Sequence, residues 1–166
     1  MYCVSHAFAA MTLGSVSRYT AVHAPCPAVV VREEATSAHR LVAVGIRNAE
    51  DCAAALAFAF EEAQFRKAAL LAVRTCQSPD SHAGAQAARE LDDLLNDWRG
   101  KYPDADASQD VVHGHPGRVL ADISLNADLV VLGRHSANGG LAPSTAGVIH
   151  VVVSHAHGPV VTVPSA

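Results

Sequence analysis

Residues 128–163 read DLVVLGRHSANGGLAPSTAGVIHVVVSHAHGPVVTV. Apolar runs open and close this stretch at 128–132 and 159–163, and a glycine-rich loop and a helical pattern lie between them. Unbroken apolar runs of this length are typical of strands that are buried on both faces. The order strand, loop, helix, strand therefore predicts part of a parallel sheet with right-handed crossovers.

The same alternation extends upstream to residue 41. Further apolar runs predict strands at 41–46, 69–73 and 110–112, and apolar residues at helical spacing predict helices between them. The predicted buried helical faces are Cys52, Leu56, Ala59, Phe60 and Ala63; Leu91, Leu94, Leu95 and Trp98; Val119, Leu120 and Ile123; and Val148, Val151, Val152 and His155. The predicted helix boundaries are Asn48 and Ser81 as N-caps, Pro116 in a first turn, and Gly100 with Pro103 as a C-terminal stop. We therefore predict an α/β fold with a doubly wound, mostly parallel sheet of five strands.

In a sheet of this kind, ligands bind beyond the carboxyl ends of the strands, where the strand order reverses. We therefore expect the loops after Ile46 and Leu132 to lie side by side at any site. The second of these loops, residues 133–147, is rich in glycine, and such a loop before a helix can cradle a phosphate group. A flexible surface loop with Gly139 and Gly140 as turn residues is the alternative interpretation.

Residues 14–31, GSVSRYTAVHAPCPAVVV, repeat residues 146–163 at a constant offset of 132. The identical pairs are Val16 and Val148, His23 and His155, Ala24 and Ala156, Pro27 and Pro159, Val29 and Val161, and Val31 and Val163. After the first copy, residues 32–39 are polar and break both neighbouring apolar patterns. We therefore expect residues 1–31 to be the C-terminal remnant of a first domain, residues 32–39 a linker, and residues 40–166 a second domain.

The apolar run 27–31 has no sheet of its own in such an incomplete domain. An uncovered strand edge is an aggregation hazard, and the matching run 159–163 is the last strand of its sheet and should lie at an edge. We therefore expect the two segments to pair through Val29–Val31 and Val160–Val163, within the chain or between two chains. Residues 14–24 should form a helix against this junction. Its predicted contacting stripe is Val16, Tyr19, Thr20 and His23.

Composition limits the class of protein. Half of the 166 residues are apolar, 17% are charged and the net charge is −4, so the chain can form a core. This charge gives no electrostatic reason to expect nucleic acid or an anionic membrane surface as a partner. The cysteines are scattered and form no CxxC pair, which is typical of core thiols in a reducing compartment: Cys3, Cys26, Cys52 and Cys76. With no apolar run of about 18 residues and no basic signal region, we expect a cytoplasmic protein.

Candidate metal and catalytic groups are few. Two histidine pairs have i, i+2 spacing: His113 with His115, and His155 with His157. Such a pair can hold a metal on one face of a strand, but a third ligand does not follow at an obvious spacing, so we expect no metal. Ser144 and Thr145 have no identifiable base partner, and Ser15 does not lie in a GxSxG elbow. The sequence therefore predicts no catalytic residue and no enzyme.

Three stretches carry a resemblance to a known family. They are ADLVVLGRHSANGG with the helix and the PVVTV strand that follow it, GSVSRYTAVHAPCPAVVV near the start, and VVHGHPGRVLADIS at 111–124. Together they resemble the universal stress protein family, over about residues 11–31 and 40–166, in an arrangement similar to the actinobacterial tandem type. The resemblance implies an adenine nucleotide alpha hydrolase-like fold. It also implies that the last strands pair antiparallel across a dimer.

In nucleotide-binding members of that family, the loop reads Gly, two residues, Gly, nine residues, then Gly with Ser or Thr. Gly133 matches the first glycine, but Ser136 holds the place of the second. Ala146 and Gly147 hold the place of the closing pair, and Arg47 replaces the Asp that contacts base and ribose. A Cβ at 136 or 146 obstructs close phosphate approach, and Gly147 offers no hydroxyl. We therefore expect ATP to bind weakly or not at all.

The first copy of the repeat shows the opposite loss. Gly14 and Ser15 match the closing pair, but the two earlier glycines would fall on Met1 and Val4. The sequence therefore predicts that the chain begins inside the phosphate loop of a first domain, and half of such a loop is not a site. A truncated gene product and a mis-assigned start both explain this.

We predict a universal stress protein-like domain that acts in the stress response by binding and association. Two alternatives stay open: an ATP-binding switch with slow ATP hydrolysis, and a non-catalytic dimerisation module. The expected partners are a second copy or the chain's own repeat, through the strands named above, and a protein of unknown identity. No cofactor is expected beyond weakly bound ATP.

Overall fold

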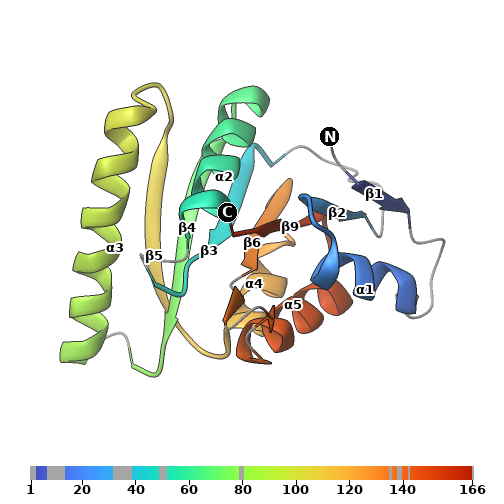
Figure 1. The fold of residues 1–166 in the computed structure, drawn as a ribbon. Helices are drawn as coiled ribbons and strands as arrows, with labels where there is room; N and C mark the ends of the chain where they lie inside the picture. Colours follow the sequence, from blue (N-terminus) through green and yellow to red (C-terminus); the bar gives the residue numbers. More distant parts are fainter. Residues whose placement is uncertain are drawn as a thin grey trace.

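The computed structural model describes residues 3–6, 14–31, 39–48, 52–78, 81–134, 136–137, 140–141 and 143–165. Within this part of the chain, seven strands form one sheet in the order β1-β2-β9-β6-β3-β4-β5 (Figure 1). The strands are β1 (Cys3–His6), β2 (Ala28–Val31), β3 (Leu41–Gly45), β4 (Ala69–Cys76), β5 (Ala107–His113), β6 (Leu129–Arg134) and β9 (Val160–Pro164). A separate two-stranded sheet joins β7 (Ser136–Ala137) to β8 (Gly140–Leu141).

Five of these strands confirm the predicted parallel sheet. β9, β6, β3, β4 and β5 all run parallel to their neighbours in this set. β4 and β5 follow β3 on one side, whereas β6 and β9 lie on its other side. The strand order therefore reverses between β3 and β6, which is the point where ligands of such sheets bind. The sheet is larger than predicted because β2 and β1 extend it beyond β9.

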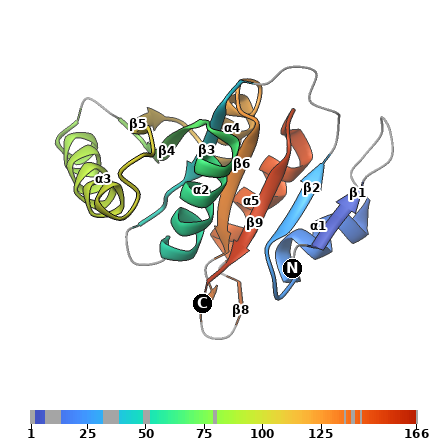
Figure 2. The same cartoon turned by 90° about the horizontal axis from the view of Figure 1, so that it is seen from above.

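Helices cover both faces of the sheet. They are α1 (Ser15–His23), α2 (Ala53–Arg66), α3 (His82–Lys101), α4 (Pro116–Ile123) and α5 (Pro143–His155). α2 and α3 lie on one face, and α1, α4 and α5 lie on the other (Figure 2). Each face carries its own apolar cluster, so the central strands are buried on both sides. The fold is therefore α/β and doubly wound, as predicted.

The inner face of α2 is confirmed and its start is corrected. Leu56, Ala59, Phe60 and Ala63 are all buried. Cys52, rather than Asn48, occupies the N-cap position. The helix starts later than predicted, so Asn48 stays in the loop after β3.

α3 begins at the predicted cap. The Ser81 hydroxyl oxygen accepts a hydrogen bond from the Gly84 amide at 3.1 Å. The buried stripe is narrower than predicted, because Leu91 and Leu95 are fully buried whereas Leu94 is only partly buried. Leu91 and Leu95 are four residues apart and lie on one side of the helix, whereas Leu94 is rotated from Leu95 by about 100° around the helix axis.

The end of α3 also differs from the prediction. The helix continues to Lys101, so Gly100 lies inside it. The last turn is stabilised by aromatic packing, since the Phe60 ring of α2 stacks on Trp98 and Tyr102 with centroids 5.8 and 5.0 Å apart. This contact favours continuing the helix through the glycine.

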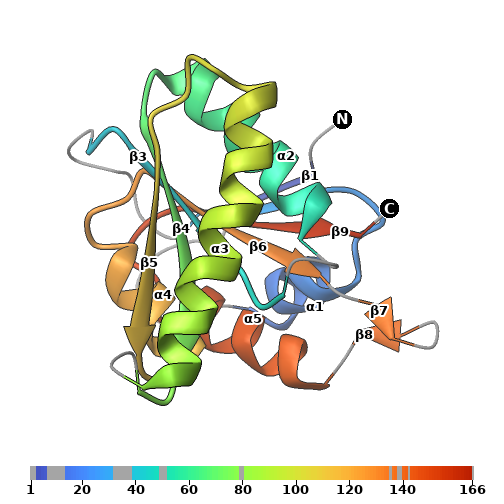
Figure 3. The same cartoon turned by 90° about the vertical axis from the view of Figure 1, so that its left-hand side faces the viewer.

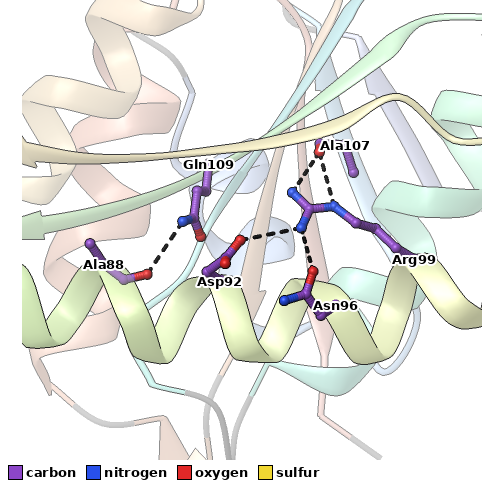
Figure 4. Close-up of polar contacts among 6 residues, drawn as sticks. All are labelled: Ala88, Asp92, Asn96, Arg99, Ala107 and Gln109. Atoms are coloured by element: carbon purple, nitrogen blue, oxygen red, sulfur yellow. Dashed lines mark hydrogen bonds and ion pairs between the residues drawn. The ribbon is translucent and has the colours of Figure 1, made fainter.

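Arg99 of α3 covers the open edge of β5 (Figure 4). The Asp106 carbonyl accepts a hydrogen bond from an amide of β4, so the next carbonyl, that of Ala107, points away from β4. The guanidinium donates to Ala107 from Nε at 3.2 Å and from Nη2 at 2.8 Å. Its Nη1 donates to Asn96 at 2.7 Å and to Asp92 at 3.3 Å. Bare edges invite pairing with other chains, and this contact occupies one outward carbonyl of that edge.

α1 forms as predicted, but its contacting face is a different one. Ser17 and Ala21 are buried, whereas Val16 and Tyr19 are exposed at 73% and 68%. The Thr162 hydroxyl of β9 donates to the Ala21 carbonyl at 2.6 Å. Small side chains allow the helix to approach the sheet closely, so they, rather than the larger apolar ones, face inward.

α5 differs from its predicted face in a similar way. Its buried residues are Ile149, Val152 and Val153. Val148 and Val151 are half-buried and His155 is exposed. The inward side is therefore rotated from the predicted one, and only Val152 belongs to both.

β2 pairs antiparallel with β9 inside the chain. Ala28 faces Thr162, Val29 faces Val161, and Val30 faces Val160. The sequence left open whether these segments pair within one chain or between two, and here they pair within one. β9 thereby has β6 on one side and β2 on the other, so its edge is filled.

Residues 3–6 form a further strand. β1 runs parallel to β2, from Cys3 opposite Ala28 to His6 opposite Val31. The physical reason is that the outer backbone groups of β2 need hydrogen-bond partners. β1 supplies them in the position that β6 holds beside β9. The phosphate loop that the sequence predicts at the start of the chain stays a prediction.

Candidate nucleotide pocket

A pocket of about 210 Å³ opens at the carboxyl ends of β3, β4 and β6. Its lining residues are Gly45, Ile46, Arg47, Asn48, Cys52, Ala55, Val73, Thr75, Pro116, Leu120, Leu132, Gly133, Ser144, Thr145, Val148 and Ile149. The loops after β3 and β6 therefore lie side by side, as predicted. The pocket sits at the reversal of strand order, so the fold itself creates it.

The floor of the pocket is apolar and closely packed. A Cβ on Gly45 would stand 2.7 Å from Leu120 Cδ1. Glycine at this point therefore lets α4 pack against the end of β3. Leu132 and Ile149 add apolar walls from β6 and α5. Such a surface suits the flat, apolar part of a ligand better than a charged part.

Arg47 lies at the exposed side of the pocket. Its Nη1 donates a hydrogen bond to Ser144 Oγ at 3.4 Å. Arg47 follows β3 and Ser144 lies in the first turn of α5, so this contact joins the two loops that border the pocket. Arg47 and Gly133, both named from the sequence, are thus brought together at one site.

Ser144 and Thr145 supply hydroxyl groups to the pocket, whereas Ala146 and Gly147 do not line it. The predicted closing pair therefore lies beyond the pocket, inside α5. The helix begins earlier than the repeat indicates, at Pro143. Proline is favoured in a first helical turn, and this signal could have placed Ser144 and Thr145 at the helix start.

Asn48 is a second residue whose place the sequence missed. It lines the pocket, and its buried Oδ1 has no hydrogen-bond partner among the described residues. A buried acceptor without a donor is destabilising. Asn48 is therefore a point where an N–H or O–H group of a ligand can donate.

The rest of the predicted loop is only partly described. Ser136 belongs to β7, which pairs with β8 just beyond the carboxyl end of β6 (Figure 3). Its side chain lies outside the described part of the structure, as do residues 135, 138, 139 and 142. The predicted effect of Ser136 on phosphate approach therefore stays a prediction.

The half loop of the first copy lies apart from the pocket. Gly14 is exposed at the N-cap of α1, and Ser15 is the first residue of that helix. Neither residue lines the pocket. Gly14 and Ser15 therefore do not take part in this pocket.

Arg134 follows Gly133 directly and ties the site to the N-terminal segment. Its Nη1 donates to the Val22 carbonyl at 3.0 Å and its Nη2 to the Cys26 carbonyl at 3.1 Å. The side chain is buried, and this burial lowers the pKa of the Arg134 guanidinium from its ordinary value. A cation at the C-terminal end of α1 is favourable because the helix dipole is negative there.

Two of the described histidines make local hydrogen bonds to the backbone. His115 Nδ1 accepts a hydrogen bond from the Gly117 amide at 3.2 Å and caps α4. His155 Nδ1 lies 2.9 Å from the Val151 carbonyl. Among the described residues, no three or more His, Cys, Asp or Glu side chains gather as a metal site would require.

A search for membrane spans covered the same residues. None of the described helices is both long and apolar enough to cross a bilayer.

A model of the universal stress protein family matches residues 39–164. The chain belongs to the universal stress protein family. The matched range includes the five parallel strands and the pocket at their carboxyl ends.

Relatives of this universal stress protein are found among mycobacterial proteins. Universal stress protein Rv2005c of Mycobacterium tuberculosis is 33% identical over 157 residues, which cover 87% of this chain and 53% of the relative. The chain thus spans about half the length of the curated relatives it matches.

Solved structures agree at the level of the fold. A universal stress protein from Archaeoglobus fulgidus has a TM-score of 0.70 at 16% identity, covering 99% of this chain and 60% of that chain. A second protein from the same organism, solved in complex with dAMP, has a TM-score of 0.59 at 18% identity, covering 74% of this chain and 95% of that one. These likenesses agree with the universal stress protein fold of the matched range.

Proposed function

We propose that this universal stress protein is a non-catalytic domain that acts in the stress response by binding and association, and that it binds ATP weakly or not at all. The observation that carries the weak binding is the place where α5 begins. It begins at Pro143, four residues before Gly147. In the first copy of the repeat, Ser15, the counterpart of Gly147, is the first residue of α1.

This extra turn changes which amides can bind an anion. The first four amides of a helix have no partner inside it and can donate to a phosphate. With the helix starting at Pro143, the amide of Gly147 is used inside α5, and proline has no amide hydrogen to offer. Ala146 and Gly147, which hold the place of the closing pair, therefore do not stand at the N-terminal end of α5, where an anion would bind.

Arg47 supports the same proposal on the adenosine side. It holds the place of an Asp that, in the family, contacts base and ribose. A carboxylate accepts hydrogen bonds from hydroxyl groups, whereas a guanidinium has only donors. The ribose therefore loses an acceptor, and a nucleotide would also have to part the Arg47–Ser144 contact.

Calorimetric titration of the full chain with ATP tests this proposal. We expect a Kd weaker than about 100 μM, or about −5.5 kcal/mol. Arg47→Asp should tighten binding by about tenfold by restoring one acceptor. Arg89→Asp makes the same charge change on the exposed surface of α3 and should leave binding as in the unmodified chain. A Kd in the low micromolar range for the unmodified chain would overturn the proposal.

An ATP-binding switch is the second candidate function. It is favoured by the open pocket at the switch point and by the solved dAMP complex of a protein with the same fold. The titration above distinguishes the two, because a switch requires ATP to bind at cellular concentrations. The third candidate, a dimerisation module, is favoured by the pairing of β2 with β9.

We also propose a domain organisation and a location. Residues 1–31 are the remnant of a first domain, residues 32–39 a linker and residues 40–166 the second domain. The repeat of residues 14–31 at 146–163 supports this division, as does the length of the mycobacterial relatives. The scattered cysteines support a reducing compartment, and we propose the cytoplasm.

A further inference from the structure

The pocket at the carboxyl ends of β3, β4 and β6 is small for a nucleotide. Its volume of about 210 Å³ lies below the roughly 300–1,000 Å³ that is usual for pockets of drug-sized ligands. It exceeds the roughly 150 Å³ of an apolar cavity that holds one benzene molecule. The volume therefore suits a ligand of one or two fused rings better than a nucleotide with its sugar and phosphates.

The wall of this pocket is apolar and already packed. The large lining side chains that are at most 5% exposed are Ile46, Val73, Leu120, Leu132 and Ile149. Because these side chains belong to the core, the pocket keeps its shape without a ligand. Burying a hydroxyl group against an apolar surface is unfavourable. The wall therefore favours a flat apolar ring over a ribose.

The polar groups gather at the solvent side of the pocket. Arg47 and Ser144 are exposed, and Thr145 is half-buried. Among the residues that line the pocket in the described part of the chain, Arg47 alone carries a formal charge. A charged group keeps part of its hydration at such a rim, whereas deep burial of a charge is very costly. The pocket therefore matches a ligand with one anionic end.

A carboxylate fits this rim better than a triphosphate does. The planar guanidinium of Arg47 matches the two oxygens of a carboxylate, and such pairs form two parallel hydrogen bonds. A guanidinium has five N–H donors and can serve several acceptors at once, and Ser144 Oγ at 3.4 Å is one of them. One negative charge balances the single positive charge of the lining residues, whereas a triphosphate brings several.

Asn48 adds a requirement for the ring itself. Its Oδ1 is buried at the pocket and has no hydrogen-bond partner among the described residues. A buried acceptor without a donor is costly. An N–H or O–H group on the ring of a ligand would supply that donor. Asn48 therefore favours a ring with such a group over a plain hydrocarbon ring.

We propose that this pocket binds an aromatic carboxylic acid of one or two fused rings with a ring N–H or O–H group. The ring lies against the apolar wall, its N–H or O–H group donates to Asn48 Oδ1, and the carboxylate accepts from Arg47 and Thr145. The inference rests on the proposed weak binding of ATP, because tightly bound ATP would compete for the same pocket.

NMR titration of the ¹⁵N-labelled full chain with indole-5-carboxylate and with 4-hydroxybenzoate tests this proposal. The amide signals of Gly45 and Gly133, which line the pocket, should shift with at least one of the two acids. For ligands of this size we expect a Kd of roughly 0.1–1 mM.

Matched analogues separate the two polar contacts. 2-Naphthoate and benzoate lack the ring donor and should bind about three- to tenfold more weakly than the acid they match. 5-Methylindole and 4-methylphenol lack the carboxylate and should bind at least about tenfold more weakly. Adenosine, titrated in the same way, should bind more weakly than the better of the two acids.

Variants assign each contact to its residue. Arg47→Met should weaken binding of the acids about tenfold, whereas Arg89→Met, which removes the same charge from an exposed position of α3, should leave it unchanged. Asn48→Leu should abolish the preference for the acid with the ring donor over its analogue without one. Continued binding of that analogue to the Asn48 variant shows that the pocket is intact.

Three results would overturn the proposal. The first is that neither acid shifts the signals of Gly45 and Gly133 up to about 10 mM, roughly ten times the weakest expected Kd. The second is that the analogues without a carboxylate bind as tightly as the acids. The third is that adenosine binds more tightly than both acids. The NMR titration contains no ATP and the calorimetric titration contains no acid, so a failure of this inference and a failure of the proposed function are distinguishable.

Discussion

Val29 of β2 lies directly opposite Val161 of β9, and the two residues are also each other's counterparts in the repeat. The neighbouring pairs obey the same symmetry. Ala28 faces Thr162, the counterpart of Val30, and Val30 faces Val160, the counterpart of Ala28. Pairing of this kind, in which residue i contacts j and the counterpart of j contacts the counterpart of i, is typical of an isologous contact around a two-fold axis. The N-terminal segment is therefore docked as a second protomer of a symmetric pair would be, within one chain.

Removing this segment should expose the edge of β9. Deletion of residues 1–36 takes away β2, in which Ala28 and Val30 are only 1% exposed. We expect a lower melting temperature and new self-association or precipitation, because a bare apolar edge can pair with another chain. Light scattering and calorimetry measure both. The control is deletion of residues 1–13, which keeps α1 and β2 and should have a smaller effect. A 1–36 deletion with unchanged mass and melting temperature would show that the segment is dispensable.

The hydrogen bond from Thr162 to Ala21 holds α1 on the sheet. Thr162 is fully buried and its Oγ1 lies 2.6 Å from the Ala21 carbonyl. Thr162→Val keeps the shape but removes the donor, so unfolding in urea should show a loss of about 1–3 kcal/mol. Thr162→Ser keeps the donor and should be less destabilising in this respect. Equal losses for the two variants would mean that the hydroxyl contributes nothing.

Arg134 should hold the C-terminal end of α1 in place. Arg134→Met removes the donors to the Val22 and Cys26 carbonyls while keeping an apolar stem. We expect faster hydrogen exchange at the amides of β2 and a loss of about 1–3 kcal/mol in unfolding free energy. Arg118→Met, on an exposed position of α4, is the control and should change neither. Unchanged hydrogen exchange in the Arg134 variant would show that this side chain does not hold α1 in place.

The core under α3 should depend on Leu95 more than on Leu94. Leu95 is fully buried, whereas Leu94 is only partly buried. Leu95→Ala should cost about 2–5 kcal/mol of unfolding free energy, and Leu94→Ala should cost clearly less. Chemical denaturation of both variants measures the difference. A larger loss at Leu94 would mean that the inward face of α3 is misplaced.

The five parallel strands and the neighbouring loops at their switch point could be predicted because buried strands give unbroken apolar runs. Ser81 could also be predicted as an N-cap, because serine is a preferred capping residue and stands just before the helical pattern. The inward faces of α1 and α5 could not be, because periodicity shows that a helix has an apolar side but not which side meets the sheet. Ser17 and Ala21 carry that contact through small size, which an apolar pattern does not register.

The site was predicted only in part, and for a similar reason. Arg47 and Gly133 follow apolar strands, so the topology places them at the pocket. Ser144 and Thr145 were missed because the repeat set the start of α5 four residues too late, at the position of Ser15 in the first copy. The sequence predicted Arg134 to lie in the loop after the strand. Its burial could not be predicted, because it depends on carbonyl groups about 110 residues away in the sequence.

Paired calorimetric titrations with adenosine and with ATP test the central claim most directly. If the extra turn of α5 removes the phosphate contacts, the three phosphates add nothing to affinity. The two ligands should then bind with Kd values within about threefold of each other, less than about 1 kcal/mol apart, and both weaker than about 100 μM. ATP binding at least about 100-fold tighter than adenosine, a gain of about 2.7 kcal/mol, would contradict the account.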